Sequence, residues 1–119
     1  MRFAWFLVAL LLSLTLAVLQ QWAVAEHLYW KYEWFDVLMH FLGGLTIASI
    51  LVALLSKFRP AWFGLLLVGV FIGWEVFEYV FGIPRESNYV FDTALDFLMD
   101  TLGALAVYVV ARYTLWRSV

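Results

Sequence analysis

The sequence contains no cysteine and few charged residues. The lack of cysteine excludes a disulfide framework and a thiolate metal site, so any bound metal would have to be held by oxygen atoms and imidazole. Only 13% of the residues are charged, and the seven Lys and Arg are scattered through a chain of net charge -2. This leaves no basic patch for the phosphates of nucleic acid, which we therefore exclude as a partner.

Hydrophobic residues dominate the chain instead. They make up 66% of its 119 residues, against roughly 45–50% in soluble domains, and the mean hydropathy is +0.94. The composition predicts a single all-α domain, residues 1–119, that is a polytopic membrane protein. Its apolar runs predict four transmembrane helices, at about residues 3–25, 34–56, 61–81 and 92–113.

The first apolar run has a second interpretation. Arg2 and the triplet Ala23-Val24-Ala25 resemble the start and the cleavage site of a secretory signal peptide. The run is longer than the usual signal core of about 7–15 residues, which favours a transmembrane helix.

The basic residues predict an orientation in the membrane. Arg2, Lys57, Arg59, Arg112 and Arg117 fall on one side of the predicted bundle, against Lys31 and Arg85 on the other. Because cytoplasmic loops carry an excess of Lys and Arg, we expect both termini to be cytoplasmic.

A motif in the second predicted helix recurs in the fourth. Residues 36–45 align without gaps on residues 96–105, an offset of sixty residues, with Asp on Asp, Met on Met and Gly on Gly. His40 aligns with Asp100. Both helices would cross the membrane in the same direction, so the repeat predicts a parallel duplication of helix pairs. The first and third helices show no comparable match.

Ionisable residues inside the predicted helices form the candidate site. They are His40, Glu75, Glu78, Asp96 and Asp100, with Asp36 and Asp92 near the helix ends. Helical spacing puts the members from each helix on one face, and a rise of about 1.5 Å per residue puts all of them at a similar depth, in the outer half of the membrane. An alternative for Asp92 is a helix cap, for Asp36 an interfacial residue, and for Glu75 and Glu78 structural hydrogen bonding.

Unpaired carboxylates inside a bilayer each cost at least about 2.5–3.5 kcal/mol, so the predicted cluster must be neutralised. A bound metal, shared protons or water entering from the outer side would each do so. Oxygen ligands with one imidazole suit a divalent ion: Zn²⁺, Mg²⁺, Mn²⁺ or Ca²⁺.

Glycines predict two helix contacts. Gly43 and Gly103 lie close to the acid-bearing faces of the second and fourth helices, which could therefore approach closely below the site. Gly69 and Gly73 point away from Glu75 on the third helix, where their small face would suit another helix or a homodimer partner.

The order of these residues resembles a known family. An Asp-x-x-x-His start to one helix (Asp36, His40), Glu in the next, Arg85 in the following loop, then Asp-x-x-x-Asp and Gly resemble the VanZ-like small membrane proteins. The segments 91–96 and 75–78 are still more similar to the related YjdF-type family. The VanZ-like pattern has Asn where Asp100 stands and Gln where Glu78 stands, so the site here is more acidic. The resemblance implies a bacterial inner-membrane protein connected with cell-envelope chemistry.

The leading functional hypothesis combines these observations. A four-helix bundle would bind a divalent cation through His40, Glu75, Glu78, Asp96 and Asp100, and would act on or recognise an anionic lipid or a lipid-linked envelope precursor. One remaining carboxylate would serve as general base, and Arg85 would contact lipid phosphate. A proton- or metal-ion-coupled transporter using the same acids is the first alternative, and a structural membrane subunit is the second.

Overall fold

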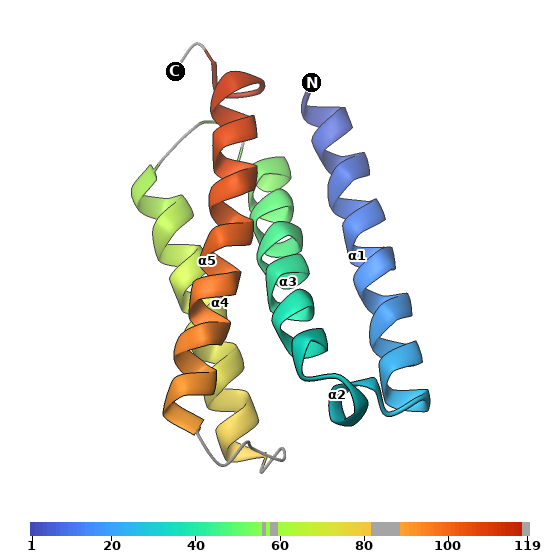
Figure 1. The fold of residues 1–119 in the computed structure, drawn as a ribbon. Coiled ribbons are helices and arrows are strands. Elements are labelled where there is room, and N and C mark those ends of the chain that lie inside the picture. The colour runs from blue at the N-terminus through green and yellow to red at the C-terminus, as the bar shows by residue number, and fades with distance from the viewer. Residues whose placement is uncertain (56, 58–59, 82–88, 118–119) are drawn as a thin grey trace.

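The computed structural model describes residues 1–55, 57, 60–81 and 89–117, and this part of the chain is helical without strands (Figure 1). Its helices are α1 (Arg2–Ala25), α2 (Leu28–Lys31), α3 (Glu33–Leu54), α4 (Pro60–Val80) and α5 (Tyr89–Tyr113). All but the short α2 are long and apolar enough to cross a membrane, which confirms the predicted all-α polytopic architecture with four such helices.

The predicted helix ends need small corrections. The connector between α1 and α3 contains the one-turn helix α2, which the sequence did not predict and which is entered through His27 in the left-handed conformation. Helix α5 begins at Tyr89, so Asp92 lies within its first turn and does not precede the helix as a cap. Its negative charge there still favours the positive end of the helix dipole.

Helix α3 is the centre of the bundle. It packs most extensively against α5, next against α1, and it also contacts α2 and α4. The two copies of the repeated motif therefore lie on neighbouring helices, α3 and α5, which run in the same direction (Figure 1). The start of α1 and the end of α5 lie at one end of the bundle, and the end of α4, the start of α5 and the α1–α3 connection lie at the other (Figure 1).

Glycine allows the close contact between α3 and α5. A Cβ atom added to Gly44 would collide with the backbone carbonyl oxygen of Asp100, and one added to Gly103 would collide with that of Phe41. The prediction for Gly103 is confirmed, but Gly43 was the wrong partner, because a Cβ there would meet nothing within 4 Å. Gly44 follows His40 by four residues and so shares the face that His40 presents to α5.

Helix α4 stands farther from its neighbours and reaches them through larger side chains. Phe63, Leu67 and Phe71 repeat at four-residue steps and are buried in the main hydrophobic cluster. The next step along the same face is Glu75, which is also buried. This apolar stripe therefore turns the Glu75 carboxylate toward the bundle interior.

The opposite face of α4 carries Gly69 and Gly73. A Cβ atom at either position would meet no described residue within 4 Å, so neither glycine packs against the part of the chain that the structure describes. The homodimer contact through these glycines stays a prediction.

The orientation in the membrane also stays a prediction and has a direct test. The chain has no native cysteine, and Lys31 and Lys57 are exposed positions at opposite ends of the bundle. In intact cells, an impermeant thiol reagent should label Lys31→Cys and not Lys57→Cys, because the positive-inside rule places the end with the termini in the cytoplasm. Labelling of Lys57→Cys alone would reverse the orientation.

Candidate metal centre

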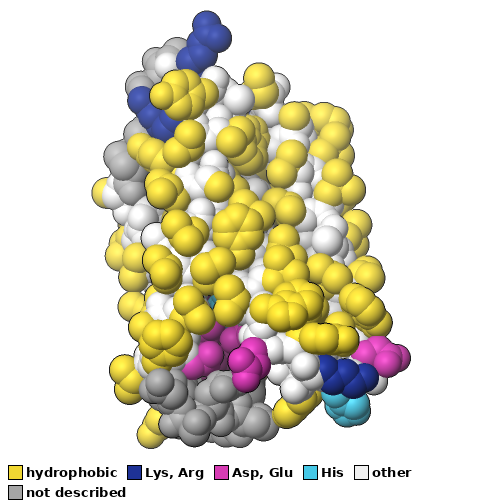
Figure 2. All heavy atoms as spheres, in the orientation of Figure 1, with side chains coloured by type: hydrophobic (Ala, Val, Ile, Leu, Met, Phe, Trp, Pro, Cys, Tyr) yellow, Lys and Arg dark blue, Asp and Glu magenta, His cyan; other side chains and the backbone are white. Residues whose placement is uncertain are grey.

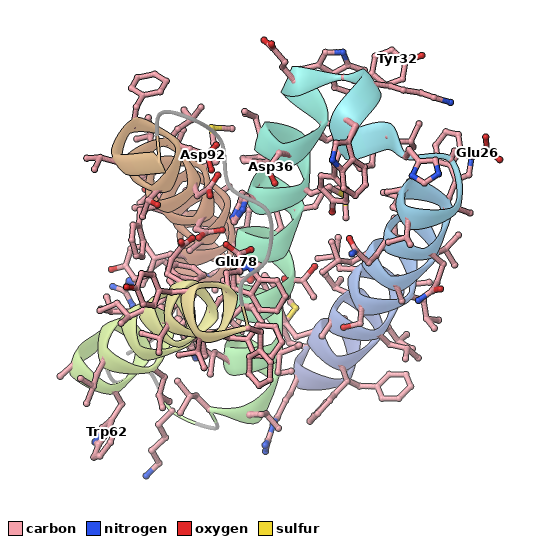
Figure 3. The ribbon with its side chains drawn as sticks, turned by 90° about the horizontal axis from the view of Figure 1, so that it is seen from below. Glu26, Tyr32, Asp36, Trp62, Glu78 and Asp92 are labelled. Atoms are coloured by element: carbon pink, nitrogen blue, oxygen red, sulfur yellow. The ribbon has the colours of Figure 1, made fainter. Side chains whose placement is uncertain are left out.

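Acidic side chains gather at the end of the bundle opposite to the termini. Figure 2 shows this group below the broad hydrophobic surface of the helices. Figure 3, which looks at the same end, shows Asp36, Glu78 and Asp92 around it, one from each of α3, α4 and α5. Three helices that are distant in sequence therefore contribute to one polar region, as the common depth of these residues predicted.

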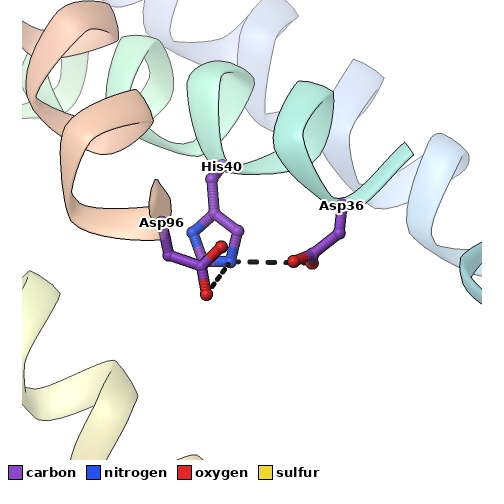
Figure 4. A group of neighbouring side chains, drawn as sticks. All are labelled: Asp36, His40 and Asp96. Atoms are coloured by element: carbon purple, nitrogen blue, oxygen red, sulfur yellow. Dashed lines mark ion pairs between the residues drawn. The ribbon is translucent and has the colours of Figure 1, made fainter. Parts of the chain in front are cut away.

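His40 is the central residue of this region. Its Nε2 atom lies 3.3 Å from Asp96 Oδ2 and 3.7 Å from Asp36 Oδ1 (Figure 4). Its other ring nitrogen, Nδ1, lies 3.1 Å from Asp100 Oδ1. The imidazole of α3 thus has carboxylates on both sides, because the glycine contact one turn along brings the Asp stripe of α5 against it.

Asp36, His40 and Asp96 form a group that could hold a metal ion. Each offers one ligand atom, and these atoms lie within 4.8 Å of one another. A first-row divalent ion bound by imidazole and carboxylate at about 2.0–2.2 Å from each ligand would fit between atoms with that spacing.

The contact with Asp100 involves the ring nitrogen that faces away from Asp36 and Asp96. Its donor and acceptor roles depend on the tautomer, and an ionised Asp100 requires Nδ1 to be the donor, because a carboxylate only accepts hydrogen bonds. In that tautomer the Nε2 atom between Asp36 and Asp96 is the one that can take a metal ion or a second proton. Asp100 acts in both cases as the group that orients the ring, a role that carboxylates often have behind metal-bound histidines.

Burial differs across the group. The Asp96 side chain is 4% exposed, whereas Asp36 is 36% exposed. A ligand entering from water would therefore reach the group past Asp36, at the start of α3.

Glu75 adds a buried carboxylate from α4. Among the described residues, neither of its oxygens has a hydrogen-bond partner, although both are buried, and Asp96 Oδ1 shares this situation. Glu75 lies within electrostatic range of His40 and Asp100. A buried carboxylate without a partner is costly, so these oxygens call for a cation or a proton.

Two residues near the site had no signal in the sequence. Thr93, one turn before Asp96 on α5, has a buried hydroxyl without a partner among the described residues. Tyr29 of α2 donates a hydrogen bond to Gln20. Burial, and then the negative charges of Asp36 and Glu78, raise the pKa of Tyr29 to about 12, so its hydroxyl stays protonated at neutral pH. The sequence indicated neither residue, because the distance of each from the site depends on how α2 and α5 pack against the other helices.

The structure describes every predicted site residue except Arg85. Asp36, His40, Asp96 and Asp100 come together, and Glu75 is buried close by. Glu78 and Asp92 are half-buried at the same end. Arg85 lies outside the described residues. Which of these residues bind a ligand stays a prediction.

Comparison with known proteins assigns the chain to no family. No family model matches the chain, and neither the curated proteins nor the solved structures that were searched contain a match. The resemblance to VanZ-like and YjdF-type proteins therefore stays a prediction.

Proposed function

We propose that this membrane protein binds one divalent cation between Asp36, His40 and Asp96. The observation that carries the proposal is the placement of three ligand atoms within 4.8 Å of one another, together with the Asp100 contact that turns Nε2 toward them. In this assignment Asp100 orients the ring and is not itself a ligand. Glu75 is a further buried carboxylate within electrostatic range of His40.

The ligand set narrows the choice of metal. One imidazole and two carboxylates without sulfur suit Zn²⁺ or Mn²⁺, whereas Mg²⁺ and Ca²⁺ prefer oxygen alone. Three protein ligands leave a coordination position open, as catalytic zinc sites do. Such an ion polarises a phosphoryl oxygen or supplies a hydroxide at neutral pH.

We further propose that the open position takes a phosphate oxygen of an anionic lipid or a lipid-linked envelope precursor. The support is positional, because Asp36 lies in the first turn of α3, a helix long enough to span a membrane, and is the most exposed of the three ligands. Glu75 is the candidate general base, since its buried oxygens have no hydrogen-bond partner among the described residues. We also propose that Arg85 contacts the phosphate of this lipid.

A proton relay is the second candidate, and the same geometry favours it. The distances of 3.1 and 3.3 Å from the two ring nitrogens to Asp100 and Asp96 suit an imidazolium between carboxylates. Toward the termini, however, the described residues beyond Asp100 contain hydroxyls such as Thr46 and Ser49 but no carboxylate or imidazole. The relay would have to continue through water or a partner.

A chelator separates these two candidates. If a metal is bound, chelation should lower the melting temperature, and an equimolar addition of Zn²⁺ or Mn²⁺ should restore it. A ligand that binds only the folded state at one hundred times its Kd stabilises by about 2.7 kcal/mol. An anionic lipid that completes the coordination sphere should then stabilise the loaded protein more than the chelated one. An unchanged melting temperature after chelation would favour the proton-bound histidine.

A further inference from the structure

A second polar feature lies at the opposite end of the bundle. A pocket of about 480 Å³ is lined by Tyr108, Val109, Arg112, Tyr113 and Arg117. These residues belong to the last turns of α5 and to the turn that follows it. The pocket therefore lies where a membrane-spanning helix leaves the apolar part of the bilayer.

The turn after α5 is fixed to the bundle, which gives the pocket a defined shape. Trp116 is 1% exposed and packs edge-on against Phe63 of α4, with ring centroids 5.5 Å apart. Arg112 Nη1 donates a hydrogen bond to the Trp116 carbonyl oxygen at 2.8 Å. The Arg112 side chain is thus held in place and does not simply extend into solvent.

Basic side chains predominate at the end of the molecule with the termini. The described residues at the end with the termini include four basic side chains and no Asp or Glu; the basic ones are Arg2, Lys57, Arg112 and Arg117. Figure 2 shows Lys and Arg side chains at this end and the acidic group at the other. An anion is the ligand that this end complements.

The pocket chemistry matches a phosphate at a membrane surface. Arginine binds phosphate oxygens through two parallel N–H groups, and tyrosine hydroxyls at the interface donate further hydrogen bonds. Val109 supplies an exposed apolar wall beside these groups. A separate apolar groove, lined by Trp5, Val8 and Val110 among others, shares no residue with this pocket.

We infer that this pocket binds the head-group phosphate of an anionic phospholipid, through Arg112 and Arg117. The inference does not depend on the metal site, which lies at the other end of the bundle. A free phosphate ion has the same charge but would make no use of the exposed apolar wall at Val109, so we assign the site to the lipid.

Thermal stability in nanodiscs tests this inference. The protein should be more stable in phosphatidylglycerol than in phosphatidylcholine of the same chain length, with or without chelator. Any Lys or Arg near an anionic surface contributes roughly a fivefold gain in affinity, and an arginine that also donates hydrogen bonds to the phosphate contributes more. Arg117→Gln alters an exposed side chain and should therefore weaken the apparent lipid affinity by more than fivefold, and the Arg112→Gln/Arg117→Gln double variant further.

Lys57→Gln is the matched control, because it removes a positive charge at the same end but outside the pocket. It should retain the preference for phosphatidylglycerol. An equal loss in Lys57→Gln and Arg117→Gln would show a diffuse surface charge and overturn the pocket. Stabilisation by inorganic phosphate in phosphatidylcholine, to the level reached with phosphatidylglycerol, would overturn the lipid as the ligand.

Discussion

Purified His40→Ala protein should retain almost no metal, and Asp96→Asn should lose it to a similar extent. The imidazole supplies the only nitrogen ligand of the proposed site, and Asp96 supplies its most buried carboxylate. Because these side chains act on one ion, the double variant should lose little more metal affinity than either single variant. Metal analysis after gel filtration in detergent measures all three proteins.

The controls for this prediction lie on the same helices. Glu33→Gln removes an exposed carboxylate from the first turn of α3 and should leave the metal content unchanged. Asp100→Asn should lower metal affinity about 10- to 100-fold without abolishing it, as expected for a group that orients a ligand. Additive losses in the double variant, or a full loss in Glu33→Gln, would contradict a shared site.

Gly44→Ala should destabilise the protein severely, whereas Gly43→Ala should not. A Cβ at Gly44 meets the backbone carbonyl of Asp100, which cannot move without displacing α5. Overpacking of this kind costs about 1–3 kcal/mol and sometimes more. At Gly43 the added methyl group meets nothing within 4 Å, so the change should be neutral or stabilising by about 0.5–1 kcal/mol through the lower flexibility of alanine in the unfolded chain.

Unfolding in detergent measures the two glycine variants side by side. Gly44→Ala should also weaken metal binding, because separating α3 from α5 moves Asp96 away from His40. Equal stability of the two variants would show that the helices do not meet at Gly44. Loss of stability with unchanged metal affinity would show that the site tolerates a wider separation.

The helices and the helix faces that carry the ionisable residues were predictable, because each depends on local pattern. Long apolar runs set the four membrane-spanning helices, and four-residue spacing put Asp36 with His40 and Asp96 with Asp100 on common faces. The repeated motif predicted that these faces belong to two helices that run in the same direction. Length, period and polarity were enough for these conclusions.

The contacts between helices were not predictable in the same way. Periodicity predicts which face of a helix is buried but not the angle at which a partner helix meets it. The sequence therefore could not distinguish Gly43 from Gly44 as the contact residue, and the prediction of Gly43 was wrong. The same angle determines that Nδ1 of His40 contacts Asp100 and that Nε2 contacts Asp36 and Asp96. Helix α2 was missed because a single turn of four residues carries too little periodicity to detect.

Metal content of the unmodified protein tests the central proposal most directly. The protein should be purified from its membrane without added metal or chelator, and its elements measured against protein concentration and against the final buffer. We predict one equivalent of a single divalent metal, Zn²⁺ or Mn²⁺, per chain. Metal at the level of the buffer, in protein that is folded and that gains no thermal stability from either ion, would contradict the metal centre and leave His40 as a protonated bridge between carboxylates.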